Sequence, residues 1–135
     1  MPYFINPIEE DQCVFLTYAG KMPPLEVVAA RYEASGLLAA KHWNQIVVDV
    51  TASRSVEALE LLDLVRGLTA DLPRRSRVTL AMRPEQAKYT NLVEEIARNA
   101  GVLLALFFDA EEALSWVKGA TSQKRTQRRP SDKPL

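Results

Sequence analysis

Three short apolar runs, separated by two segments with helical periodicity, constrain the fold of this chain more than any other feature. The runs are "QIVVDV" (residues 45–50), "SRVTLAM" (76–82) and "VLLALFF" (102–108). Near-continuous apolar runs of this length are typical of strands that are covered on both faces. The intervening segments, 56–72 and 83–101, repeat apolar residues at helical spacing. Strands that alternate with helices build a largely parallel sheet through right-handed crossovers.

The N-terminal part of the chain adds an antiparallel pair of strands. Two strand candidates, residues 3–8 and 13–20, are joined by the acidic turn "EEDQ", and a connection this short predicts a hairpin. The first helix is expected over residues 23–40, because prolines are tolerated in a first helical turn. Helical spacing places four residues on one apolar face, which we expect to cover the sheet: Leu25, Val28, Ala29 and Tyr32.

The second and third helices are predicted from their apolar stripes. In the second helix the acidic residues Glu57, Glu60 and Asp63 should face outward. Its inward stripe is Val56, Leu59, Leu62, Val65 and Leu68. The third helix should begin at Pro84 and stop at Gly101. Its stripe is Tyr89, Leu92, Val93, Ile96, Ala97 and Ala100.

The segment "DAEEALSWVKG" predicts a last helix that closes the domain. Asp109 is expected to be the N-cap, with Glu112 as its capping-box partner. Phe108 should pack against Ala113 as a hydrophobic staple, and Gly119 should end the helix. The predicted fold class is therefore α/β, with a mixed, mostly parallel sheet of about five strands, opened by a β-hairpin, and about four helices.

Composition predicts one folded domain, residues 1–118, followed by a basic tail, residues 119–135. The 135 residues are 47% hydrophobic, which is enough for one domain with a buried core. The tail contains only Ala120 and Leu135 as apolar residues, so we expect it to be disordered. Its basic cluster suggests weak, salt-sensitive contact with nucleic acid or acidic surfaces, although a solubilising role is the simpler interpretation: Lys124, Arg125, Arg128 and Arg129.

The sequence gives little support for catalysis, a metal or a cofactor. Cys13 is the only cysteine and is expected to be a buried, inert thiol, while His42 is the only histidine and has no metal-ligand partner at suitable spacing. No glycine-rich phosphate loop is present in "TASRS". The first residues have no basic region followed by a long apolar run, and no apolar stretch approaches the roughly 20 residues of a membrane span, so we expect neither a leader nor a span. We therefore expect a soluble, cytoplasmic protein without enzymatic activity.

Three segments together resemble the SpoIIAA-like branch of the STAS domains, the sulfate transporter and anti-sigma-factor antagonist superfamily. They are "IVVDVTASRS", leading into the second helix, the strand "RVTLAM" and the ending "LFFDAEEALSWV". The resemblance covers roughly residues 3–118. It implies a regulatory protein that docks onto a kinase-like partner and is switched off by phosphorylation of a serine, in an Asp-Ser-Ser-Gly sequence at the start of the second helix.

The corresponding region here is "TASRSVEA", in which the family's adjacent Asp and Gly are missing. Ser53 and Ser55 lie where the phosphorylated serine would be, and a helix N-terminus favours a phosphate. The simpler interpretation is that Ser55 is the N-cap of the second helix, with Glu57 in its first turn. Both interpretations of the two serines stay open.

The functional prediction is a non-enzymatic regulatory or protein-interaction domain that docks through the strand-loop-helix edge at residues 49–57. Its candidate contact residues are Asp49, Thr51, Ser53, Arg54, Ser55 and Glu57. The alternative is a small apolar or lipid ligand held between the helices and the sheet, with residues 23–40 as one wall. A homodimer is a further option, with Met22, Trp43 or Tyr89 exposed at the contact.

Overall fold

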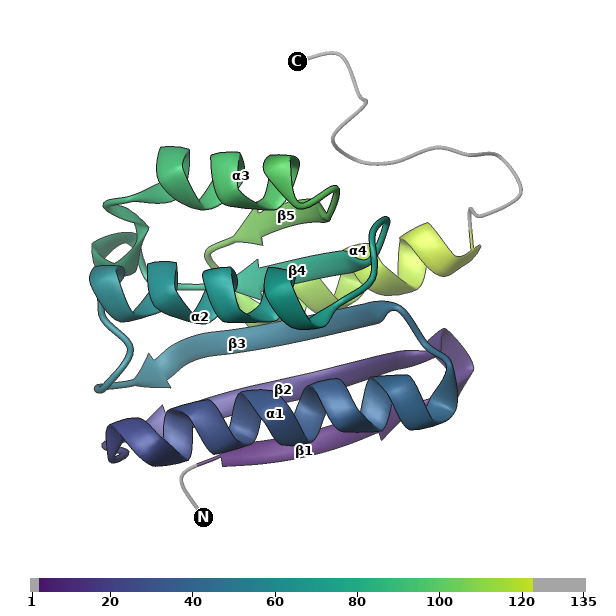
Figure 1. Cartoon of the computed structure of the whole chain (residues 1–135), viewed down its shortest axis with the longest axis horizontal. Helices are drawn as coiled ribbons and strands as arrows, with labels where there is room; N and C mark the ends of the chain where they lie inside the picture. Colours follow the sequence, from purple (N-terminus) through teal and green to yellow (C-terminus); the bar gives the residue numbers. More distant parts are fainter. Residues whose placement is uncertain (1–2, 123–135) are drawn as a thin grey trace.

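A computed structural model describes the backbone of residues 3–122 and the side chains of residues 3–119. Five strands form one sheet in the order β1-β2-β3-β4-β5 (Figure 1). β1 is antiparallel to β2, and the remaining neighbours are parallel. The strands are β1 Tyr3–Ile8, β2 Cys13–Gly20, β3 Gln45–Ser53, β4 Arg77–Ala81 and β5 Leu103–Phe107. The predicted mixed sheet, opened by a hairpin, is confirmed.

Helices cover both faces of the sheet. The helices are α1 Pro24–Lys41, α2 Ala58–Asp71, α3 Thr90–Asn99 and α4 Ala110–Ser122, with short 3-10 helices η1 Glu9–Asp11 and η2 Pro84–Ala87. In Figure 1, α1, α2 and α3 lie in front of the sheet and α4 lies behind it. α4 contacts β3, β4 and β5.

Two apolar clusters follow from this layering. The larger one joins α1, α2 and α3 to the sheet and includes Leu16, Val48 and Leu80 from three neighbouring strands. The smaller one lies under α4 and consists of Cys13, Val47, Ala81, Ala113 and Val117. β3 supplies both clusters because alternate side chains of a strand point to opposite faces. This explains why β3 is buried from Gln45 to Val50.

The predicted inward face of α1 is wrong. Leu25, Val28 and Tyr32 are exposed, by 82%, 40% and 58% respectively. The buried residues are the small Ala30 and Ala34 together with Leu38. Small residues let α1 lie close to the sheet, so the larger apolar residues of this helix face solvent. In α2 the predicted stripe is buried except for Leu59, which is 56% exposed.

The predicted third helix is divided in two. Pro84 starts the 3-10 helix η2, and α3 begins only at Thr90. Val93 and Ala97 are buried as expected, whereas Leu92 is 47% exposed.

α4 begins as predicted and ends later than predicted. The Asp109 carboxylate accepts a hydrogen bond from the Glu111 N–H at 2.7 Å, the contact expected of an N-cap. Phe108 stays 59% exposed. α4 continues through Gly119 to Ser122, so Gly119 is not its end. The rest of the predicted tail, including its basic cluster, lies outside the described residues.

None of the three residues named for a homodimer contact is exposed as expected, and Tyr89 is partly buried. Met22 is 5% exposed and belongs to the larger apolar cluster, and Trp43 packs against that cluster. Within the described part of the chain, no helix is long and apolar enough to cross a membrane.

Candidate functional site

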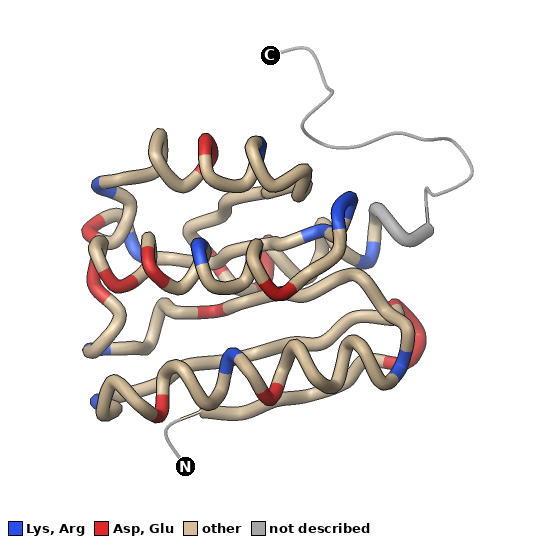
Figure 2. The backbone as a smooth tube through the Cα atoms, in the orientation of Figure 1, with Lys and Arg blue, Asp and Glu red and all other residues tan. Residues whose placement is uncertain are grey.

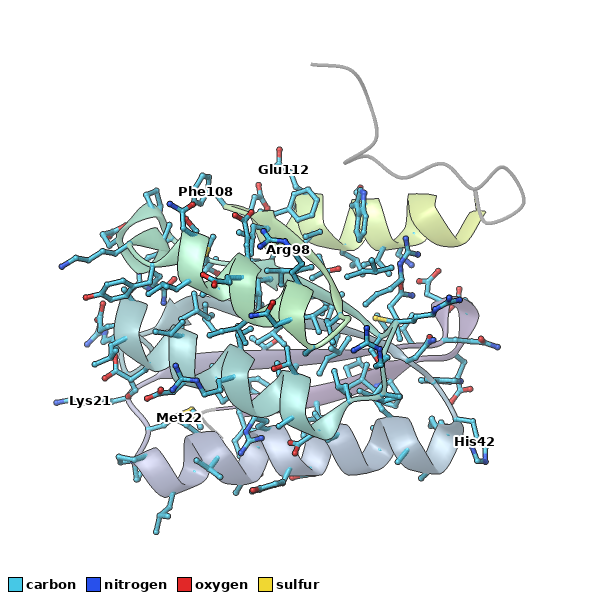
Figure 3. All side chains as sticks on the ribbon, turned by 45° about the horizontal axis from the view of Figure 1, so that its top comes forward. Lys21, Met22, His42, Arg98, Phe108 and Glu112 are labelled. Atoms are coloured by element: carbon cyan, nitrogen blue, oxygen red, sulfur yellow. The ribbon has the colours of Figure 1, made fainter. Side chains whose placement is uncertain are left out.

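Residues 49–57 lie at the edge of the sheet where the parallel strands end. β2, β3 and β4 all have their carboxyl ends here, at the left of Figure 1, beside the first turns of α1 and α2. In an open sheet with helices at its strand ends, this edge is the usual place for binding. Figure 3 shows Met22 at this end of α1 and His42 at the opposite end.

Asp49 and Thr51 form a closed pair. Asp49 Oδ1 accepts hydrogen bonds from the Thr51 N–H at 2.9 Å and from Thr51 Oγ1 at 2.6 Å, and Asp49 is only 8% exposed. Alternation along β3 puts Asp49 on the same face as Val47, which packs under α4. The Asp49 carboxylate therefore supports the turn on the side of the sheet away from α1 and α2.

Ser53, one of the candidate contact residues, is not available at the surface. It is fully buried, and its Oγ accepts hydrogen bonds from the N–H groups of Ser55 at 3.2 Å and Val56 at 3.0 Å. Two backbone donors are satisfied by one hydroxyl, which turns the chain from β3 toward α2. Ser53 thus holds the loop from inside.

The prediction that Ser55 is the N-cap of the second helix is wrong. α2 begins at Ala58 and its N-cap is Glu57, whose N–H donates to Glu60 Oε1 at 3.2 Å. The Ser55 hydroxyl instead accepts a hydrogen bond of 2.6 Å from the Met22 N–H. Ser55 therefore ties the start of α1 to the loop that precedes α2.

Two residues after β4 complete the loop, and the sequence analysis missed both. Arg83 Nη1 donates to the carbonyl oxygens of Thr51 at 2.7 Å and Ser53 at 2.8 Å. Gln86, 1% exposed, donates through Nε2 to the carbonyl oxygens of Val50 at 3.0 Å and Val56 at 2.6 Å. The available signal was their position directly after a parallel strand, because neighbouring strand ends meet at one edge.

Arg54 and Glu57 are the candidate residues that this network leaves facing outward. The Arg54 backbone is fixed by its N–H, which donates to the Gly20 carbonyl at 2.7 Å, but its exposed side chain has no hydrogen-bond or ion-pair partner among residues 3–119. The exposed Glu57 carboxylate lies 4.0 Å from Arg83 Nη2. Among residues 3–119, a rigid backbone therefore presents the Arg54 cation without a partner and the exposed Glu57 carboxylate, which also belongs to the capping box of α2.

A groove of about 270 Å³ opens beside this loop, between the first turns of α1 and α2. Its apolar lining comes mainly from the start of α1, and Ser55 lies on its wall. On the α2 side it is lined by Glu60, Asp63 and Leu64. Sequence reasoning placed a ligand wall in residues 23–40, and the groove uses the N-terminal half of that segment.

Arg31 lines the groove on the side away from the loop and connects α1 to α2 there. Its guanidinium donates to Asp71 Oδ2 at 2.6 Å and lies directly against Gly67 of α2. A Cβ at position 67 would collide with the guanidinium, so glycine allows this approach between the helices. The two helices are therefore joined at Arg31, and the groove lies between that contact and the loop.

The residues considered for other chemistry are not arranged as a site. Cys13 is fully buried, and burial raises the pKa of its thiol to about 12, so it is protonated at neutral pH and a poor nucleophile. Within residues 3–122, no three His, Cys, Asp or Glu side chains are grouped so that they could hold a metal ion.

Comparison with known proteins gives a structural likeness only. No family model and no curated protein matches the sequence. Among solved structures, the chain is similar to an anti-sigma factor antagonist from Mycobacterium paratuberculosis, with a TM-score of 0.60, 14% identity and coverage of 86% of this chain and 92% of that one. It is also similar to an uncharacterised DUF3478-family protein from Shewanella loihica PV-4 with a SpoIIAA-like fold, with a TM-score of 0.53 and 15% identity, covering 85% and 91%. The chain has the SpoIIAA-like, STAS-like fold.

Proposed function

We propose that this chain is a non-enzymatic regulatory domain that acts by docking a protein partner at residues 49–57. The observation that carries the proposal is the rigidity of the loop. Long-range hydrogen bonds from Met22, Arg83 and Gln86 fix its backbone and hydroxyl groups. Arg54 and Glu57 remain available, and a surface that is ordered beforehand loses little entropy on binding.

The structural neighbour adds support of a general kind. An anti-sigma factor antagonist is, by its name, a protein that acts on another protein, and its structure spans almost the same length as this chain. Within the proposal, Arg54 and Glu57 make the partner contacts, whereas Asp49, Thr51 and Ser53 hold the loop in shape.

The proposal is tested by charge reversal at the edge. Arg54→Glu should weaken capture of a cellular partner from host lysate, with little change in melting temperature, because the Arg54 side chain has no partner within residues 3–119. Arg98→Glu on α3 is the matched control, since Arg98 is also exposed and lies on a different helix (Figure 3). Equal retention of every partner by both variants would contradict the proposal.

Phosphorylation of the loop would provide its regulation, and the geometry favours Ser55 over Ser53. Ser55 lines the groove, whereas the Ser53 hydroxyl is fully buried and accepts two backbone hydrogen bonds. A phosphate on Ser55 would disrupt its contact with the Met22 N–H and add negative charge beside Glu60. Phosphopeptide mapping after incubation with host lysate and ATP should find Ser55, and a modification that persists in Ser55→Ala would exclude it.

A small apolar ligand is the second candidate function, and the groove is the observation that favours it. Its volume of about 270 Å³ is slightly below the roughly 300–1,000 Å³ of common ligand sites. Native mass spectrometry of the protein purified from its host distinguishes the two functions. Retained small-molecule mass supports the ligand, whereas subunit mass alone supports the protein-docking proposal.

A further inference from the structure

The groove between α1 and α2 has an apolar floor with an open side. Met22 and Leu64 are 5% and 4% exposed and form its deep part. Val28, 40% exposed, stands at its rim on α1. An apolar side chain that entered here would be removed from water on several sides, which is the setting of strong contacts at protein interfaces.

The apolar surface continues out of the groove along α1. Leu25, Val28 and Tyr32 follow one another at intervals of three and four residues, so they form one stripe on the helix surface. Leu25 is 82% exposed. A stripe of large apolar residues that continues an apolar groove indicates an interaction surface rather than scattered exposed residues.

The charges on the α2 side of the groove are acidic. Arg31 is the one cation in the described lining, and Asp71 neutralises it at 2.6 Å with only 12% of the Arg31 side chain exposed. Glu60 and Asp63 are exposed. Glu60 Oε1 accepts the Glu57 N–H at 3.2 Å, and among residues 3–119 the ion-pair partner of Asp63 is Arg66, at 3.6 Å. The side chains of Asp63 and Arg66 are each exposed by about two thirds, so this ion pair adds little stability. Figure 2 shows acidic positions gathered at this end of α2.

We propose that the groove between α1 and α2 binds a segment of the partner protein that carries one large apolar side chain flanked by lysine or arginine. The apolar side chain enters between Met22 and Leu64, and the basic residues pair with Glu60 and Asp63. This inference rests on the proposed function and names the chemistry of the partner.

A second copy of this chain fits the groove less well than such a segment. The exposed stripe of α1 would have to enter it, and that stripe is flanked by Glu26 and Glu33. Those carboxylates would then approach Glu60 and Asp63, and like charges in an interface oppose binding. Residues 123–135 contain Lys and Arg as well as Leu135, so a peptide of residues 119–135 is one probe of the test.

The test is selection of random twelve-residue peptides on the full-length chain. Enriched peptides should combine an aromatic or large aliphatic residue with at least two basic residues, and their affinity should fall as salt rises. Val28→Glu, and separately the double variant Glu60→Lys/Asp63→Lys, should each weaken binding about tenfold or more. The controls on α3 are Leu92→Glu and Glu94→Lys/Glu95→Lys, which should bind as wild type does.

Chemical-shift mapping of the selected peptide on the wild-type protein makes the result independent of the variants. Shifts at the amides of Met22, Val28 and Leu64 support the inference. Enriched peptides without basic residues, shifts elsewhere, or equal binding by both groove variants would overturn it. Tighter binding of the 119–135 peptide than of any selected peptide would also overturn it, because the occupant would then be the chain's own tail.

The outcome also separates this inference from the function on which it rests. If no selected peptide uses the groove while Arg54→Glu still loses its partners, the groove inference fails and the docking edge stands. If peptides bind the groove as described while Arg54→Glu keeps every partner, the groove inference is supported and the edge at residues 49–57 is not the docking site.

Discussion

The two helices that flank the groove distribute their apolar residues in opposite ways. α2 buries large side chains such as Leu61 and Leu68 and exposes Glu60 and Asp63. α1 buries two alanines and one leucine, Leu38, and exposes Leu25, Val28 and Tyr32. α2 therefore buries most of its large apolar side chains, whereas three large apolar side chains of α1 stay exposed. The difference is that α1 leaves apolar surface exposed to solvent, as the proposed groove contact requires.

The largest expected effect tests this comparison directly. Leu68→Ala in α2 should lower the free energy of unfolding by about 2–5 kcal/mol, because it opens a cavity in a packed core. Leu25→Ala in α1 should change it by no more than about 0.5 kcal/mol. Urea denaturation of the two variants measures both values. Similar losses in the two would mean that Leu25 is covered in solution.

The junction that leads into α2 should be nearly as sensitive as its core. Ser53→Asp should lower the free energy of unfolding by about 1–3 kcal/mol, since it places a charge where a buried hydroxyl accepts two N–H groups. Ala52→Asp, at the neighbouring exposed position, is the control and should have a small effect. If Ser53→Asp is as stable as the control, the loop is not held from inside.

Cys13, in the cluster under α4, should make the stability of the domain depend on pH in the alkaline range. Burial raises the pKa of the Cys13 thiol from 9.0 to about 12, so between these values the folded state holds a proton that the unfolded state has lost. The free energy of unfolding should therefore fall as pH rises through this range, by up to about 1.4 kcal/mol per pH unit.

Cys13→Ala should make this slope shallower. Burial also raises the pKa of Tyr18, which adds a fall of the same sign in both proteins, so the comparison is between slopes. Denaturation curves at a series of alkaline pH values measure them, and identical slopes would show that Cys13 is not shielded from water.

The smallest expected effect concerns the contact between the two helix starts. Ser55→Ala should lower the free energy of unfolding by about 0.5–1.5 kcal/mol, because the Met22 N–H loses its acceptor. Hydrogen exchange should accelerate at the Met22 amide and not in the first turn of α2. The reverse pattern would show that Ser55 caps α2 after all.

The sequence predicts the strands well and the helix surfaces less well, for a physical reason. Strands such as Gln45–Ser53 contain a short continuous apolar run, and such a run indicates a strand that is covered on both faces. α1 has apolar residues on nearly all sides, so its periodicity contains two stripes. Which one is buried depends on side-chain size: Ala30 and Ala34 allow close approach to the sheet, whereas Leu25 and Tyr32 do not.

For the candidate site, the sequence predicts the location and does not predict the hydrogen bonds that its residues make. Position at the strand ends indicates the edge at residues 49–57, but the roles of its hydroxyl groups depend on contacts between distant segments. Ser55 bonds to Met22, which lies 33 residues away. Gln86 bonds to the carbonyl of Val50, 36 residues away. Local patterns carry no record of such pairs, so Ser55 was assigned as the cap of the helix that follows it in the sequence.

Site-specific photo-crosslinking in cells of the source organism tests the central claim, that this edge docks a protein partner. A photoreactive amino acid is placed at position 54, in the rigid loop, and separately at position 98, on α3. We predict a discrete crosslinked protein from position 54 that is absent from position 98. Crosslinks from position 98 alone, or the same products from both positions, would contradict the account.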